Sequence, residues 1–324
     1  MGATRRDLLL TAGALAGGAL TGTDLGLSVA GGAVAAPAAP PVIDTKVVLL
    51  GTKGGPRVIK GRSNPANLVL ASATPYVVDC GYGTTHQLIE AGVDLQLIRN
   101  VFLTNCLADR MMDLGPLLYS AWTNGLVQPI HVWGPPPLKR VLRSYFQSIS
   151  HDIALRIEQE HRPDLLQLVK VHEFDRSGLV MQADGVKVTS VKVRHPPVLN
   201  SFAYRFDTPT RSVVFSGATA YSPELIAFAS RADVLVHEVM HLGGVERMLA
   251  RIPNAPELRK RIFGGHTTTT EVGRVAAEAE VRTLVLTQFI PGDDASITED
   301  MWAADIKKSS FLGKIVVGRD LMTV

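Results

Sequence analysis

The chain has 324 residues, of which 46% are hydrophobic and 19% charged, with a formal net charge of +3. This length and composition suffice for a large hydrophobic core. Lys and Arg are spread along the chain without basic blocks or interleaved aromatic residues, which argues against a nucleic acid partner. Only two cysteines occur, Cys80 and Cys106, so a disulfide framework is excluded. We expect two free thiols, although the two could pair if their strand ends are neighbours.

The first 41 residues are predicted to be an export signal followed by a spacer. Residues 4–9, TRRDLL, resemble a twin-arginine signal, and a Gly/Ala-rich apolar run follows to Leu20. Residues 33–35 offer a small-residue cleavage site before the Ala/Pro spacer that ends at Pro41. The apolar run is too short and too rich in glycine for a membrane anchor, and no later stretch reaches transmembrane length. We therefore expect a periplasmic or secreted protein without a stable membrane span.

Residues 42–324 alternate strand and helix patterns without an internal linker, which predicts a single domain. The strands are expected at 46–50, 67–71, 76–79, 101–103, 129–133, 168–174, 179–183, 186–193, 202–207, 212–216, 234–239, 283–287 and 315–318. The helices are expected at 84–91, 138–149, 152–160, 223–230 and 268–279. Strand-rich segments in both halves predict an α/β (α+β) sandwich of two packed sheets with helices outside.

One loop has the outline of an active site. Residues 101–103 form a buried strand, the chain turns at Thr104 and Asn105, and an apolar helix-like run begins behind Asp113. A turn at the end of a buried strand is where an α/β protein usually places its chemistry.

Several segments, in order, resemble the metallo-β-lactamase-fold superfamily, in its tRNase Z-like and arylsulfatase-like branch. The matching residues are Leu50-Gly51-Thr52, Asp79-Cys80-Gly81, Phe102-Leu103-Thr104, Asp109, Ser216-Gly217-Ala218-Thr219, His237-Glu238, Gly265-His266-Thr267 and Leu286-Thr287-Gln288-Phe289. The resemblance implies an αββα fold of two mixed sheets flanked by helices, with a site at one edge where loops from both halves meet.

In that superfamily, two zinc ions are held by a His-x-His-x-Asp-His loop, a mid-chain His, an Asp in a Ser-Gly-Asp-Thr turn and a late His. The matching positions here are Asn105, Leu107, Asp109, Arg110, His195, Ala218 and Gln288. Only Asp109 and His195 keep a metal-ligand side chain, and two ligands cannot hold two zinc ions. We therefore expect a degenerate zinc site and no cofactor, with Arg110 paired to Asp109 in the vacated space.

Further residues could contribute chemistry near this site. The segment 237–241 matches the H-E-x-x-H motif, but it continues a predicted strand, whereas the zinc motif requires a helix. The resemblance implies that His266 assists proton transfer, with Glu238 in support; the alternative is a helix-entry histidine bonded to the backbone. Asp79 is expected to be a structural carboxylate. The histidines His86, His131, His151, His161 and His172 are scattered and expected to be surface or packing residues.

The sequence is compatible with three functions. The first is a non-catalytic homologue whose pocket, with Arg110, Asn105 and His237, binds a small anionic or ester-type ligand. The second is a hydrolase of ester or phosphate bonds that uses one zinc held by Asp109, His195 and a rescuing group such as Glu238. The third is covalent chemistry on Cys106, with its thiol pKa lowered by a nearby cation. The oligomeric state is left open.

Overall fold

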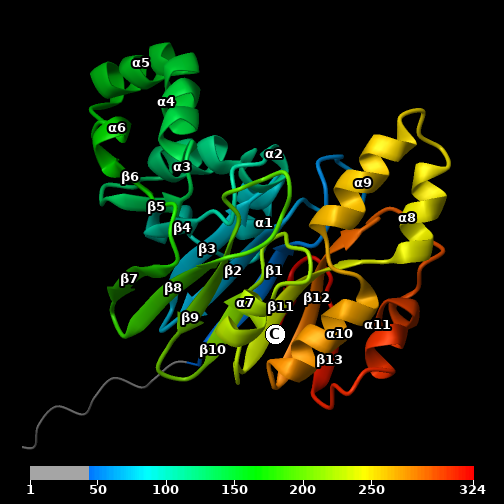
Figure 1. The fold of residues 1–324 in the computed structure, drawn as a ribbon. Helices are drawn as coiled ribbons and strands as arrows, with labels where there is room; N and C mark the ends of the chain where they lie inside the picture. The colour runs from blue at the N-terminus through cyan, green and yellow to red at the C-terminus, as the bar shows by residue number, and fades with distance from the viewer. Residues whose placement is uncertain (1–43) are drawn as a thin grey trace, which may run out of the picture. The chain divides into compact units, whose positions relative to one another are not determined.

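The computed structural model describes residues 44–324, so the predicted export segment at residues 1–41 lies outside the described residues. The described residues fold into two seven-stranded sheets that pack face to face, with helices on both outer faces (Figure 1). The predicted αββα sandwich is therefore confirmed. No helix within residues 44–324 is long and apolar enough to cross a membrane.

The first sheet comes mainly from the N-terminal half of the domain. Its strand order is β14 (Met322–Thr323), β1 (Lys46–Gly51), β2 (Ala66–Ala71), β3 (Thr74–Cys80), β4 (Asn100–Phe102), β5 (Ile130–Gly134) and β6 (Val169–Glu173). Strands β3 to β6 run parallel to one another, so their carboxyl ends lie at one edge of the sandwich.

The second sheet comes from the C-terminal half. Its order is β13 (Lys314–Val317), β12 (Thr283–Ile290), β11 (Val234–Met240), β10 (Ser212–Phe215), β9 (Phe202–Asp207), β8 (Val186–Lys192) and β7 (Gly178–Ala183). Strands β10 to β13 are again parallel to one another. The two halves of the domain thus each contribute a set of parallel strands.

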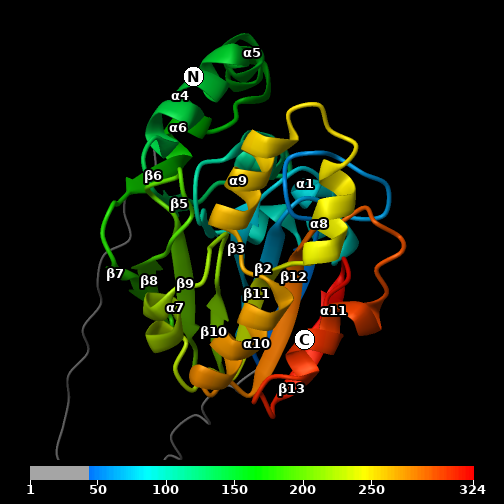
Figure 2. The ribbon, with the colours of Figure 1, turned by 45° about the vertical axis from the view of Figure 1, so that its right-hand side comes forward.

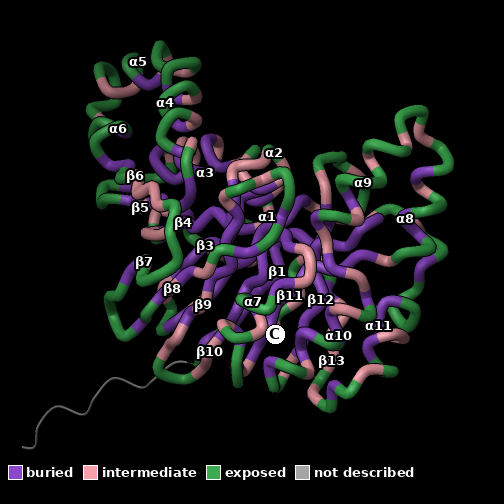
Figure 3. Tube along the Cα trace, viewed as in Figure 1, coloured by how far each residue is buried: buried purple, intermediate pink, exposed green. Residues whose placement is uncertain are grey.

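Alternating side chains on the central strands are buried on both faces. On β1, Val47 and Leu49 lie in the core between the sheets, whereas Val48 and Leu50 lie in the core under the first helical layer. Because both faces are buried, the sequences of these strands are continuous apolar runs rather than alternating apolar and polar residues. The strands are largely buried, and the exposed residues lie mainly on helices and loops (Figure 3).

The helices form two outer layers. The first sheet is covered by α1 (Thr84–Glu90), α2 (Ala108–Met111) and α3 (Leu114–Thr123), and the second by α7 (Pro223–Phe228), α10 (Thr269–Glu278) and α11 (Glu299–Lys307). The predicted helix 268–279 corresponds to α10. It begins where predicted because Thr268 and Glu271 form a reciprocal capping box.

Two helical arms project beyond the sheets in both views (Figures 1 and 2). The first arm contains α4 (Leu138–Ser148), α5 (Ser150–Glu160) and α6 (Leu165–Leu168), which follow β5. The second arm contains α8 (Leu242–Leu249) and α9 (Ala255–Gly265), which follow β11. The second arm was not predicted from the sequence. Each arm leaves the carboxyl end of a parallel strand.

Candidate functional site

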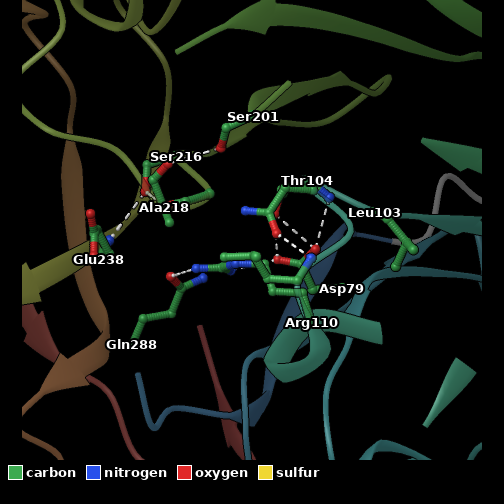
Figure 4. A network of polar contacts seen from close by, with 12 residues as sticks. Asp79, Leu103, Thr104, Arg110, Ser201, Ser216, Ala218, Glu238 and Gln288 are labelled. Carbon is green, nitrogen blue, oxygen red and sulfur yellow. Dashed lines mark hydrogen bonds and ion pairs between the residues drawn. The ribbon is translucent and has the colours of Figure 1, made fainter. Parts of the chain in front are cut away.

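Arg110 lies at the centre of the site. Its guanidinium is buried, donating from one terminal nitrogen to Asp79 Oδ2 at 2.8 Å and from the other to Gln288 Oε1 at 2.6 Å (Figure 4). The predicted pairing with Asp109 is wrong, because Asp79 at the end of β3 faces the guanidinium more directly. Burial would lower the pKa of Arg110, but Asp79 and Asp109 raise it above its ordinary value. Arg110 is therefore a permanent buried cation.

Asp79 fixes the site loop as well as the arginine. Its carboxylate accepts hydrogen bonds from the backbone N–H of Thr104 at 2.8 Å and from the Thr104 hydroxyl at 2.9 Å. The structural role predicted for Asp79 is thus borne out by its contacts. This carboxylate ties the turn after β4 to the end of β3.

Two residues that hold Arg110 have unusual backbone conformations. Asp79 has φ of 61° and Gln288 has φ of 49°, in the left-handed region that non-glycine residues rarely adopt. Such strain persists where the surrounding structure over-determines it and is concentrated at functional sites. Both side chains, Asp79 from β3 and Gln288 from β12, accept hydrogen bonds from the guanidinium.

Two buried hydrogen-bond donors at the site lack a partner among the described residues. They are Nε of Arg110 and Nδ2 of Asn105. The Oδ1 atom of Asn105 accepts from the backbone N–H of Leu107 at 2.9 Å, which fixes the amide orientation. Buried donors without a partner are costly, so an acceptor atom fits here.

The buried Glu238 and the partly exposed His266 form a second pair. His266 Nδ1 lies 2.6 Å from Glu238 Oε2, and the backbone N–H of Thr219 donates to Glu238 Oε1 at 2.8 Å. Burial raises the pKa of Glu238, but His266 and the Thr219 donor outweigh it and hold the pKa below its ordinary value. His266 is thus bonded to a carboxylate rather than to the backbone, as the predicted supporting role for Glu238 requires.

His195 lies beside this pair. Its Nδ1 is 2.7 Å from the carbonyl oxygen of Gly265, and its ring is edge-on to His266 with centroids 5.0 Å apart. Burial and the neighbouring His266 lower the pKa of His195 to about 4. The ring is therefore neutral near pH 7.

His237 does not belong to the pocket in which it was predicted. It alternates with Glu238 along β11 and lies on the face of Leu235, which packs under the second helical layer. The H-E-x-x-H segment is a strand up to Met240, and His241 is the N-cap of α8. The zinc-protease interpretation is thus excluded by geometry, as predicted.

The cysteines are both free thiols, as expected. Burial raises the pKa of Cys106 to about 12, and its Sγ lies 3.2 Å from the carbonyl oxygen of Pro135. The neighbouring carboxylates of Glu173 and Asp79 raise this pKa further, and the guanidinium of Arg110 is paired with Asp79. Cys106 therefore lacks the thiolate that covalent chemistry requires.

The side chains at the site do not fit a pair of zinc ions. Zinc requires lone-pair donors such as imidazole, carboxylate or thiolate. Arg110 offers N–H groups instead, and at about 4 Å from a dication its charge would cost roughly 8 kcal/mol at a dielectric of about 20. Within residues 44–324, no group of three His, Cys, Asp or Glu side chains is placed to hold a metal.

Comparison with known proteins places the chain in a family. The family model described as anti-Pycsar protein Apyc1 matches residues 45–278. Ribonuclease Z of Mycobacterium bovis is 31% identical over 284 residues, which cover 86% of this chain and 97% of the relative. Ribonuclease Z of Mycobacterium marinum is also 31% identical, over 86% of this chain and 98% of that protein. The chain belongs to the Apyc1 family, in the tRNase Z-like branch of the metallo-β-lactamase superfamily.

Solved structures share the fold of this metallo-β-lactamase-fold chain. YhfI of Bacillus subtilis superposes with a TM-score of 0.64 at 21% identity, covering 86% of this chain and 98% of that one. The short form of human tRNase Z gives 0.61 at 19% identity, with the same coverage of 86% and 98%. At these identities the likeness concerns the fold, which is that of hydrolases.

The relatives correct one prediction. The chain was expected to have no nucleic acid partner, yet its relatives are named ribonuclease Z and tRNase Z. The distribution of Lys and Arg along the sequence does not show how they are arranged on the folded surface. Residues spread along a chain can gather on the folded surface, where a polyanion meets them.

Proposed function

We propose that this protein is a non-catalytic member of the tRNase Z-like branch that binds a phosphodiester of RNA where its relatives hold metal. The observation that supports it best is the buried Arg110, held between Asp79 and Gln288. Arg110 and Gln288 occupy two of the positions that the superfamily uses for metal ligands. The proposed loss of the zinc pair follows from this exchange of lone-pair donors for N–H donors.

The free donors suggest which atom is bound. The unpartnered Nε of Arg110 and Nδ2 of Asn105 both present N–H groups, which a phosphate oxygen can accept. The charge of Arg110 is compensated by Asp79, so the site offers directed hydrogen bonds more than net charge. Such a site suits one phosphodiester of a longer chain whose remaining phosphates are bound elsewhere.

The two helical arms could supply those further contacts. Exposed basic residues lie on α4 and α9, and α9 ends at Gly265 directly before His266. They are Lys139, Arg140, Arg143, Arg259, Lys260 and Arg261. Contacts between such residues and phosphates dominate the affinity of proteins for nucleic acids.

Binding without cleavage is the test of this proposal. Fluorescence anisotropy with a labelled single-stranded RNA should show saturable binding, and the RNA should stay intact after prolonged incubation with added Zn²⁺. The Asn105→Asp variant keeps the acceptor for Leu107 but replaces the free donor with a negative charge. We expect it to weaken binding about 5- to 100-fold, the cost of a lost buried hydrogen bond.

Asn124→Asp is the matched control, since Asn124 is exposed at the end of α3 and gains the same charge. It should bind RNA like the original protein. An original protein that does not bind RNA, or an Asn105→Asp variant that binds equally well, would rule out the proposed site.

The alternative function is a hydrolase with one metal ion. It is favoured by the intact Glu238–His266 pair beside His195, an arrangement suited to proton transfer. Zinc-dependent cleavage of the RNA that disappears in His195→Ala would establish this alternative in place of the binding function.

We further propose that the protein is exported to the periplasm or beyond by the twin-arginine route. The support is the TRRDLL segment and the small-residue site before Pro41. A folded reporter fused behind residues 1–41 should be exported, and Arg5→Lys with Arg6→Lys should retain it in the cytoplasm. Asp7→Asn is the control and should be exported; equal export of all three would contradict the proposal.

A further inference from the structure

A cavity outside the Arg110 site lies at the edge of the sandwich, between β5 and β6 of the first sheet and β7 of the second. Its volume is about 510 Å³, within the ~300–1,000 Å³ range of small-molecule sites. The residues that matter for its chemistry are His131, Trp133, His172, Asn100, Gln128 and Gln182. Three are aromatic rings and three are amides.

Two of these rings, Trp133 and His172, stack in a row with Phe102 across three parallel strands, and we call this row the aromatic ladder. Phe102 on β4 is the register partner of Trp133 on β5, which is the partner of His172 on β6. The Phe102 and Trp133 rings are stacked at 6.3 Å and 11°, and those of Trp133 and His172 at 3.9 Å and 14°. Because β6 is the edge strand of its sheet, the ladder ends at His172.

His131 widens the end of this ladder. Its Nδ1 lies 2.9 Å from Nε2 of His172, and the two rings are inclined by only 21°. Burial lowers the pKa of both histidines, so one neutral ring donates to the other. The hydrogen-bonded pair thus presents a flat surface wider than one imidazole, packed against Trp133.

The rest of the cavity supplies polar groups around this surface. Asn100 accepts a hydrogen bond from Nε1 of Trp133 at 3.0 Å through Oδ1, which leaves its amide N–H₂ available. Gln128 and Gln182 are exposed and can present either donor or acceptor. Side-chain amides with both donor and acceptor match the edges of nucleobases.

We propose that this cavity binds a nucleobase. The base would stack on the His131–His172 pair, and its polar edge would form hydrogen bonds with the side-chain amides of the cavity. The planar base would stack on His172 as His172 stacks on Trp133. A metal ion fits less well than a base, because Lys170 is the register partner of His131 and adds a positive charge beside the pair. This inference does not depend on the function proposed for the Arg110 site.

The test uses calorimetric titration of the whole protein with three probes: adenosine 5′-monophosphate, adenosine and ribose 5-phosphate. We expect the two compounds that contain the base to bind and ribose 5-phosphate not to bind. His172→Leu, which removes the flat ring, should weaken adenosine binding about 5- to 100-fold, the contribution of one stacked base. His172→Phe keeps a flat ring and should retain most of the affinity.

The control is His86→Leu, because His86 on α1 is exposed and lies outside the cavity. Thermal unfolding of each variant verifies that it is folded. No binding of adenosine, equal affinity in His172→Leu, or ribose 5-phosphate binding as tightly as adenosine 5′-monophosphate would each overturn the proposal.

Discussion

At the scale of single residues, one side chain decides how the site is interpreted. Arg110 joins Asp79 of the first half to Gln288 of the second, so a buried ion pair lies where loops from both halves meet. A buried pair adds little net stability over an apolar substitute, but the loss of one partner leaves the other as an uncompensated charge. Arg110 is therefore costly to remove.

Replacing Arg110 with Met should lower the free energy of unfolding by about 3–5 kcal/mol, because the buried Asp79 loses its partner. Urea denaturation measures this change. Arg156→Met removes a partly exposed arginine from ion pairs on α5 and should cost less than about 1 kcal/mol. Adding Asp79→Asn to Arg110→Met should recover part of the loss. An Arg110→Met variant no less stable than Arg156→Met would contradict this account of the pair.

His195 should make the protein sensitive to acid. Its pKa is lowered from 6.5 to about 4 in the folded state, mainly by burial. Between these pH values the unfolded chain binds the proton more readily, so the stability present above pH 6.5 falls as pH decreases toward 4. The loss should approach about 3 kcal/mol.

Urea denaturation at neutral pH and near pH 4 should show that His195→Gln loses less stability on acidification than the original protein. His86→Gln, on the exposed face of α1, should lose as much as the original. Identical losses for His195→Gln and the original protein would mean that His195 is not buried as described.

At the scale of elements, helix α10 positions the Glu238–His266 pair. Thr268 caps α10 only two residues after His266, and its hydroxyl is bonded to Glu271. Thr268→Ala should lower the free energy of unfolding by about 0.5–2 kcal/mol, the usual cost of a lost cap. Thr270→Ala, exposed in the same helix, should change it by less than about 0.5 kcal/mol. Equal costs in urea denaturation would contradict the capping role.

The elements that could be predicted from sequence are those with a strong local signal. The cap at Thr268 and the apolar run of β11 fix their boundaries within a few residues. Helices α8 and α9 were missed because their segment contains glycine pairs at 243–244 and 264–265, which interrupt a helical pattern. Boundaries that depend on tertiary packing carry little local signal.

At the scale of the whole molecule, the site is assembled from both halves of the sandwich. The family resemblance of the sequence was enough to place Arg110 and Gln288 at one site, with Asp79 as a structural carboxylate. It could not identify their pairing, since Arg110 and Gln288 are separated by 178 positions. The side of β11 on which His237 lies depends on the packing of the second sheet, so its predicted place in the pocket was wrong.

The proposed exchange of metal ligands for an arginine network should be reversible if the surrounding fold is intact. The substitutions Asn105→His, Leu107→His, Arg110→His, Ala218→Asp and Gln288→His together restore the ligand pattern of the superfamily. Folded protein with this set should gain zinc, because the strands that present these positions are retained. A folded variant without zinc would mean that the loop geometry differs from that of the metal-binding relatives.

The zinc content of the purified protein, measured by atomic spectrometry after growth with added zinc and dialysis, tests the central claim most directly. The presence of Arg110 between Asp79 and Gln288 predicts well below one zinc ion per chain, while the five-substitution variant should approach about two. About two tightly held zinc ions per chain in the original protein would contradict the account.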